Sequence, residues 1–381
     1  MLPWGREYEI VKNQRAFALR DCVFGMAVLA ALAAVTLPAL SQVRMDSMRQ
    51  ACIGNYRFIA STSSSYINDN AGKMWALNWK AGTLNPMVPG TQYFSTDSEA
   101  QSYQAIGIYR RLANLTAQQT PVPAGWVPQI LSSHTALLDY VNQPIPASFM
   151  VCPSDSTRQE FLDGDYSNLP ASGGDGSSSV WRWIYSSSYQ WDVYQWSPSR
   201  TYQAQAPWGG PLRWAAMPYH LSTTTNLWSF DGDTTLPGAF GPKLAADVRF
   251  PSQKVFLSDD YARHNGQTRY FAEQSAAQDL LFHDGSVRYF RTDSTNPGWN
   301  PQTRSSRGNM TNRFQFTKEA DAFGALSNGA RSVACKAGWY RWTRGGLFGW
   351  DVPRLSSMVG KLPSPGVVEN EVNTGPATGT W

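Results

Sequence analysis

The residues that could perform acid–base, nucleophilic or metal chemistry are few in this chain of 381 residues. The chain lacks a phosphate-binding glycine loop, a dinucleotide fingerprint, a nucleophilic-serine elbow and a zinc-binding spacing. His283 and Asp284 are adjacent at an expected turn and do not make an organised dyad. We therefore expect no catalytic residues, no metal site and no enzymatic activity. The other histidines are His134, His220 and His264.

Asp259 and Asp260 close an apolar segment over 254–260 that we expect to be a strand. Two neighbouring carboxylates could help to bind calcium, which takes about six to eight oxygen ligands. No ligand loop of recognisable spacing surrounds them. The expected cofactor is therefore none, with calcium as a secondary hypothesis.

Asp284 precedes Gly285 between two apolar-rich segments, 280–283 and 286–290. Asp-Gly in this setting is the strongest short hairpin signal, because a type I′ turn needs positive φ at both central residues. A structural turn is therefore favoured over a catalytic role for Asp284. A secreted hydrolase that uses this acid and the two above is the least favoured function.

The composition favours an exported surface protein. Hydrophobic residues make up 42% of the chain, enough for a packed core, whereas charged residues reach 16% against a usual ~25%. A net charge of +4, spread over 32 basic and 28 acidic residues, argues against a nucleic-acid protein built on a basic face. At roughly 150 residues per domain, the length fits one large domain or two ordinary ones.

Residues Cys22–Leu40 form the only long apolar segment, with 19 consecutive uncharged positions. As a helix the segment would span about 28 Å, close to a ~30 Å hydrocarbon core. A multi-spanning transporter or channel is thereby excluded. Basic residues before the segment predict a cytoplasmic N-terminus, a single pass through the inner membrane, and export of the rest to the periplasm or cell surface. These residues are Arg6, Lys12, Arg15 and Arg20.

Three kinds of segment fit this pattern. A cleaved secretory signal would use Ala39–Ser41 as a weak cleavage site. A simple signal anchor would keep the segment without cleavage. A prepilin segment would be cut on the cytoplasmic side, before the apolar run, and would keep that run on the mature protein.

The junction RAFALRD over 15–21 favours the prepilin interpretation, because it resembles the class III signal. That signal has a small residue before the cut, Phe as the first mature residue and an acid at the fifth. The resemblance implies cleavage between Ala16 and Phe17 by prepilin peptidase, and N-methylation of Phe17. Asp21 becomes the fifth mature residue and Pro38 the twenty-second, where pilins and pseudopilins characteristically place a helix-kinking proline.

Asp21 has a chemical reason to stand at the edge of the apolar run. A lone carboxylate near a bilayer core costs about 2.5–3.5 kcal/mol on insertion scales, so it persists when a partner neutralises it. In pilin-like assemblies the partner is the new α-amino group of a neighbouring subunit, here that of Phe17. Asp21 and Arg20 could also lie at the membrane interface and pair with water. The junction departs from the usual signal at three positions, where Ala16 replaces Gly, Asp21 replaces Glu and Arg20 replaces an apolar residue.

Apolar residues at helical spacing continue after the membrane segment, so we expect one long helix that ends near Asn68–Gly72. Three later elements resemble a large, poorly characterised bacterial family of prepilin-like proteins related to the major pseudopilin of type II secretion. They are similar to the family's Cys-x-x-Asn-Leu-Arg-Gln, Cys-Pro-Ser-Asp and His-x9-Asp-Gly patterns, although 19 residues separate His264 from Asp284. The elements lie at 52–57 with 66–72, at 149–155, and at 264–266 with 282–287.

Cysteine placement bears on the exported part of the chain. Cys22 lies in the apolar run, whereas Cys52, Cys152 and Cys335 are expected in a compartment where disulfides persist. Three thiols allow three single pairings and leave one cysteine over. Cys52 and Cys152 both lie in the family-like elements, so the resemblance favours a disulfide between these two. The pairing of Cys335 stays open.

The remaining segments are predicted more coarsely. Helices are expected over Ser98–Ala113 and Pro128–Val141. Strand patterns dominate from Ser148 onward, with one strand over Val180–Tyr185 and a Gly/Ser-rich loop over 164–179.

Seven of the 16 tryptophans fall between Trp181 and Trp228. Flat aromatic faces can bind sugars or partner surfaces, but an aromatic-rich core is the favoured interpretation. An exported carbohydrate- or partner-binding module that uses this region is the alternative function.

The expected fold is α+β, with a long N-terminal helix packed on a mainly antiparallel sheet, pilin- or pseudopilin-like with large insertions. The expected organisation is a leader (1–16), a helix (17–72) with its transmembrane part at 22–40, an exported globular domain (73–360) and a mobile tail (361–381). The expected function is a membrane-anchored structural subunit of a pilus-like or type II secretion pseudopilus assembly. Its expected partners are other pilin-like subunits, prepilin peptidase and the inner-membrane assembly machinery, without nucleic acid.

Overall fold

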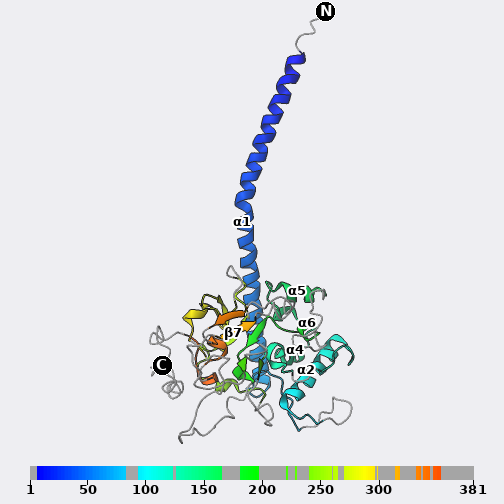
Figure 1. Cartoon of the computed structure of the whole chain (residues 1–381), viewed down its shortest axis with the longest axis vertical. Coiled ribbons are helices and arrows are strands. Elements are labelled where there is room, and N and C mark those ends of the chain that lie inside the picture. The colour runs from blue at the N-terminus through cyan, green and yellow to red at the C-terminus, as the bar shows by residue number, and fades with distance from the viewer. Residues whose placement is uncertain are drawn as a thin grey trace, which may run out of the picture. The chain divides into compact units, whose positions relative to one another are not determined.

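One long helix, α1 (Glu7–Asp69), begins the computed structural model and runs through the whole apolar segment, with Pro38 inside it (Figure 1). It crosses the Ala16–Phe17 junction without interruption, so the boundary of the leader stays a prediction. The expected tail lies outside the described residues. The structure describes residues 7–82, 93–122, 126–164, 181–196, 220–221, 228–229, 240–259, 261–264, 270–296, 298, 314–317, 332–335, 338–343 and 346–352.

The C-terminal end of α1 falls where the sequence predicts it. Ala71 and Gly72 adopt positive φ angles of 53° and 78°. The amide of Gly72 donates to the carbonyl of Ile67 at 2.9 Å, which is the six-to-one hydrogen bond of a Schellman cap. The predicted stop at Asn68–Gly72 is therefore confirmed.

The chain divides into two compact units, Met1–Ala51 and Cys52–Trp381. In the first unit the apolar side chains of α1 are exposed, with Phe24 at 73%, Leu29 at 67% and Val35 at 72% of their accessible surface. Within the described part of the chain, this is the helix whose length and composition suit a membrane crossing.

In the second unit, α1 turns one face into the core. Cys52, Tyr56, Ile59 and Ser63 are buried, and their spacing of four, three and four residues places them on one side of the helix. The residues between them are mostly exposed. This half of the helix is therefore amphipathic, and it is held by packing.

The second unit contains a four-stranded antiparallel sheet in the order β1-β4-β5-β6. The central strands β4 and β5 are buried throughout, whereas edge strand β6 is partly exposed. Two further antiparallel pairs, β2 with β3 and β7 with β8, are also described. The strands are β1 (Tyr189–Trp191), β2 (His220–Leu221), β3 (Trp228–Ser229), β4 (Val255–Asp259), β5 (Ala277–Phe282), β6 (Val287–Arg291), β7 (Phe314–Thr317) and β8 (Ser332–Cys335).

The buried face of α1 packs on this sheet. Tyr56 and Ile59 share one hydrophobic cluster with Leu257 of β4 and Leu281 of β5. The register places Leu257 opposite Leu281, so the cluster spans the centre of the sheet. The α+β class, with a long N-terminal helix and an antiparallel sheet, is confirmed.

The β5–β6 hairpin is formed as expected, but its turn differs from the expected type I′. Gly285 has a φ of 82°, whereas Asp284 is not among the residues with positive φ. The amide of Gly285 donates to Phe282 O, and the amide of Phe282 donates to Ser286 O, both at 2.9 Å. The loop therefore holds three residues, as in a type I turn closed by a left-handed glycine, because only one position has to leave the right-handed region.

The helices of the second unit confirm one sequence prediction and correct two. Helix α2 matches the predicted 98–113, whereas the predicted 128–141 is broken into α3 and α4. Figure 1 shows α2, α4, α5 and α6 gathered on one side of α1. The helices are α2 (Asp97–Ala113), α3 (Gln129–Ser132), α4 (Thr135–Val141), α5 (Ser156–Leu162), α6 (Trp181–Ile184) and the short 3-10 turns η1 (Ser148–Met150), η2 (Val193–Gln195), η4 (Ala245–Asp247), η5 (Thr292–Ser294), η7 (Trp339–Arg341) and η8 (Gly346–Phe348).

The predicted strand over Val180–Tyr185 is wrong, because Trp181–Ile184 forms the helix α6. Tertiary packing outweighs the strand preference of aromatic residues here. Trp181 is buried against Tyr109 and Trp126, with ring centroids 6.0 and 5.9 Å apart. Apart from its first residue, the expected loop over 164–179 lies outside the described residues.

Three tryptophans of the Trp-rich region, Trp181, Trp191 and Trp196, have described side chains, and all three are buried. Trp191 packs edge-on against Trp75 with centroids 4.6 Å apart. These rings therefore belong to the core, as the favoured interpretation predicts. The side chains of the other four lie outside the described part of the chain.

Candidate functional site

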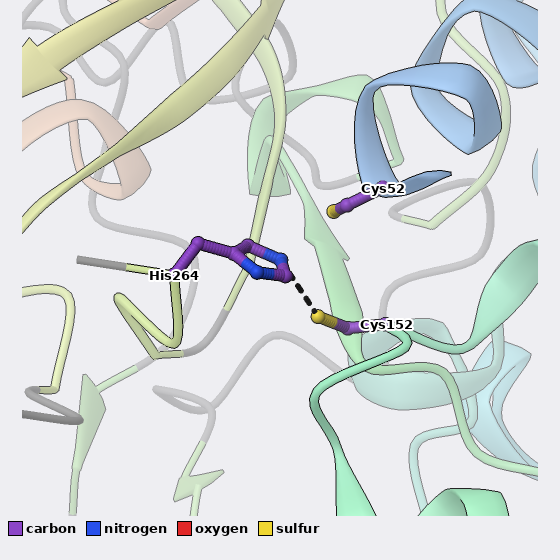
Figure 2. A group of neighbouring side chains, drawn as sticks. All are labelled: Cys52, Cys152 and His264. Carbon is purple, nitrogen blue, oxygen red and sulfur yellow. Dashed lines mark hydrogen bonds between the residues drawn. The ribbon is translucent and has the colours of Figure 1, made fainter. Parts of the chain in front are cut away.

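Two cysteines and one histidine from distant segments meet at one point in the second unit. Figure 2 shows Cys52 on α1, Cys152 in the turn between η1 and α5, and His264 in the segment after β4. The two Sγ atoms and a ring nitrogen of His264 all lie within 4.8 Å of one another. Cys152 Sγ is 3.2 Å from His264 Nε2. Among the described residues, this is the one group of three or more such side chains close enough to share a metal ion.

Hydrogen bonds to Ser188, which directly precedes β1, and to Asp155, which precedes α5, fix the backbone of Cys152. The amide of Cys152 donates to Ser188 Oγ at 3.0 Å, and the carbonyl of Cys152 accepts from the amide of Asp155 at 2.8 Å. Asp155 then caps α5 by accepting from the amide of Arg158 at 3.3 Å. The Cys-Pro-Ser-Asp segment is therefore a tight turn that starts a helix and points Cys152 inward.

Cys52 Sγ forms a hydrogen bond with the hydroxyl of Tyr189. It lies 3.3 Å from the hydroxyl of Tyr189, which also accepts from Asn55 Nδ2 at 3.2 Å. Asn55 Nδ2 donates to the carbonyl of Val151 as well, which fixes the orientation of the amide. Because the Tyr189 oxygen already accepts from Asn55, its proton is free to point at the sulfur of Cys52.

The imidazole of His264 is oriented from its other side. Ser154 Oγ lies 3.2 Å from His264 Nδ1, so Nε2 is the nitrogen directed at the sulfurs. The preceding residue, Arg263, pairs with Asp155 at 3.0 Å and also with Asp259. These two ion pairs tie the segment that carries His264 to α5 and to the end of β4.

The surroundings of Cys152 keep its sulfur protonated as a thiol. Burial raises the pKa of Cys152 well above its ordinary value, and Cys52 and Asp259 raise it further. Burial lowers the pKa of His264, but its hydrogen bond to Cys152 and the nearby acids outweigh burial and raise it. A thiol that stays protonated is a poor nucleophile. The raised pKa of Cys152 therefore argues against nucleophilic catalysis by this thiol.

Arginine side chains form ion pairs with the acids of the site. Burial alone would raise the pKa of Asp155, but Arg158 and Arg263 outweigh burial and hold it well below its usual range. Asp259 accepts from the amide of Tyr261 at 3.1 Å and pairs with Arg263. Oδ1 of this carboxylate therefore serves protein donors, and the calcium hypothesis stays untested. Asp260, the other acid of that hypothesis, lies outside the described residues.

The structure also places the remaining predicted residues. Asp284 Oδ1 accepts from the amide and the hydroxyl of Ser286, so this acid stabilises the turn. Pro38 lies inside α1. Ala16, Phe17 and Asp21 lie on α1, and their side chains are outside the described part.

Cys52 and Cys152 are both free cysteines, so the disulfide expected between them is not formed in the structure. Each of the three family-like elements supplies one member of the group, and the structure brings these members together. Sequence reasoning joined the two cysteines and left His264 out, because a separation of 112 residues between Cys152 and His264 carries no spacing signal.

No family model, curated protein or solved structure matches the chain.

Proposed function

We propose that the protein is a membrane-anchored, prepilin-like structural subunit of a pilus-like or type II secretion pseudopilus assembly. The observation that carries the proposal is the change of character along α1. Its residues 22–40 are uncharged and exposed on every side, whereas Cys52–Asp69 of the same helix lies in a globular unit.

The exposed apolar half needs a non-aqueous partner. Side chains such as Leu29 and Val35 are left open to the surroundings, and lipid would cover them in a membrane. A subunit that leaves the membrane for a filament would exchange lipid for the same helix of its neighbours. The basic residues ahead of the segment favour a cytoplasmic N-terminus, which would export the second unit.

The second unit supports the finer fold assignment. A buried helix face packed on an antiparallel sheet is the arrangement that the pilin- and pseudopilin-like interpretation requires. The segments between β1 and β4 and between β4 and β5 are long, as expected for a pilin-like domain with large insertions.

In this proposal prepilin peptidase cuts after Ala16, and the methylated amine of Phe17 becomes the new N-terminus. Asp21 then neutralises the α-amino group of Phe17 in a neighbouring subunit. The pair stabilises the assembly because each charge would otherwise lie unpaired in a low dielectric.

The test compares Asp21→Ala with Ala16→Leu and with Asp46→Ala as a matched control. Asp46 is an exposed acid on the same helix, beyond the apolar run, and accepts from Gln42 at 3.2 Å. Cross-linking of subunits in membranes is the readout. We expect Asp21→Ala to insert normally but to lose most cross-linked product, Ala16→Leu to lose it through blocked cleavage, and Asp46→Ala to behave as wild type.

Two results would separate the parts of the proposal. Normal assembly of Asp21→Ala beside a defect in Ala16→Leu would keep processing and reject the charge pair. Normal behaviour of all three variants would reject the prepilin function and leave a simple anchored or secreted protein.

A further inference from the structure

We infer that Cys52, Cys152 and His264 bind one Zn²⁺ ion through the two Sγ atoms and Nε2, with water completing a tetrahedral site. The site lies within the second unit, so the inference stands whether or not the chain assembles as a pilin-like subunit. Its residues come from α1, from the turn before α5 and from the segment after β4.

The geometry is close to that of a bound ion. Zinc bonds of about 2.3 Å to sulfur and about 2.0–2.1 Å to nitrogen, at tetrahedral angles, put two sulfurs ~3.8 Å apart and sulfur and nitrogen ~3.6 Å apart. In the structure Cys152 Sγ and His264 Nε2 are 3.2 Å apart, and all three ligand atoms lie within 4.8 Å. Small side-chain rotations therefore suffice to form the site.

The charges balance as well. Two thiolates and one neutral imidazole cancel the charge of a divalent cation, which removes the main cost of burying an ion. Each cysteine loses its proton as its S–H bond is replaced by an S–Zn bond, and both protons leave to solvent. Cys52 and Cys152 are 3% and 0% exposed, so the ion would be shielded on the side of the sulfurs.

The surroundings of the three ligands are those of a built site. Ser154 holds Nδ1 of His264, as the second hydrogen bond of a metal-bound histidine requires. Tyr189 directs its hydroxyl at Cys52 Sγ, which suits a sulfur that carries negative charge. Arg263 holds the segment beside His264 through two carboxylates.

The donor set selects the metal. Sulfur and imidazole ligands favour zinc, whereas calcium and magnesium prefer oxygen. A disulfide between Cys52 and Cys152 would consume both sulfur ligands and would leave His264 without a chemical role. The imidazole directed at the sulfurs therefore favours the metal over the disulfide.

The experiment measures zinc bound to the full-length chain, extracted in detergent under reducing, anaerobic conditions and loaded with Zn²⁺. We expect about one zinc per chain in wild type and in Cys22→Ser, whose cysteine is exposed and outside the site. His264→Ala should weaken binding by more than the ~10–100-fold that loss of a supporting hydrogen bond costs. His264 is only partly buried, so this variant should keep the wild-type circular dichroism spectrum.

A second readout needs no variant. Zinc should slow alkylation of Cys52 and Cys152 in the wild-type chain and leave Cys22 unaffected, whereas Ca²⁺ at the same concentration should protect none of them. Three results would overturn the inference: no zinc in the wild-type chain, equal zinc affinity in His264→Ala, or a Cys52–Cys152 linked peptide from protein isolated without reductant.

Discussion

The two halves of α1 differ in what surrounds them, although they belong to one continuous helix. Residues 22–40 are uncharged and exposed on all sides, whereas the half from Cys52 to Asp69 buries one stripe of its surface. An all-round apolar helix needs lipid or other helices, and a striped one needs a single packing partner. Both halves are helical, so the pattern of apolar residues around the helix determines whether a half is exposed or packed in the globular unit.

The largest expected effect comes from placing charge in the first half. Leu29→Arg combined with Leu32→Arg should cost about 5–7 kcal/mol of insertion free energy, at about 2.5–3.5 kcal/mol for each charge. The membrane-bound fraction after alkaline extraction is the measurement, and it should fall sharply. The matched control is Ser47→Arg combined with Gln50→Arg, two exposed positions on the same helix beyond the apolar run. Equal membrane binding of the two double variants would remove the distinction between the halves.

A second prediction concerns the stripe of the other half. Ile59 is fully buried, whereas Leu40 is 63% exposed. Ile59→Ala should lower the free energy of unfolding of the second unit by about 2–5 kcal/mol, because it removes buried methyl groups and leaves a cavity. Leu40→Ala should leave it unchanged. Denaturant unfolding in detergent, followed by tryptophan fluorescence, is the measurement, and a loss of similar size in both variants would contradict the account.

A buried histidine beside the hydrophobic cluster that packs on α1 predicts that the stability of the second unit depends on pH. His134 is buried and stacks on Trp191 with centroids 5.8 Å apart. Burial is the main cause that lowers its pKa from 6.5 to about 3; a hydrogen bond with the backbone of Tyr185 opposes this shift, and the charge of Arg158 adds to it. Because the folded pKa is depressed, the stabilisation is complete above pH 6.5 and is lost as the pH falls toward 3.

His134→Gln should remove this dependence. The stability of the wild type relative to the variant should fall by ~1.6 kcal/mol between pH 6.5 and pH 5, because the unfolded chain binds a proton in this range and the folded chain does not. Asp155, whose pKa is held below its usual range, loses its contribution only at more acidic pH and does not confuse the comparison. Parallel stability curves for the two proteins over this range would show that His134 does not titrate as described.

The sequence predicts some elements well because their signals are local. The end of α1 follows from Asn68–Gly72, and the β5–β6 hairpin follows from Asp284 and Gly285 between apolar segments. The strand prediction for 180–185 is wrong because aromatic residues fit a strand or a buried helix equally well. Packing against Tyr109 decides between the two.

The Cys52, Cys152 and His264 group could be predicted only in part. Each residue lies in a short recognisable element, but no local sequence pattern predicts that the three elements lie close together in space. Their meeting depends on how α1 packs on the sheet and on the ion pairs of Arg263. Such long-range contacts leave no periodicity in the sequence, which is why the histidine was missed.

The central claim is that the first half of α1 is retained after cleavage on its cytoplasmic side. The most direct measurement is the intact mass of the protein extracted from membranes of cells that possess prepilin peptidase. The account predicts the mass of residues 17–381 plus one methyl group on Phe17. Loss of residues 1–41 would contradict it in favour of a secretory signal, and an uncut chain would contradict it in favour of a simple anchor.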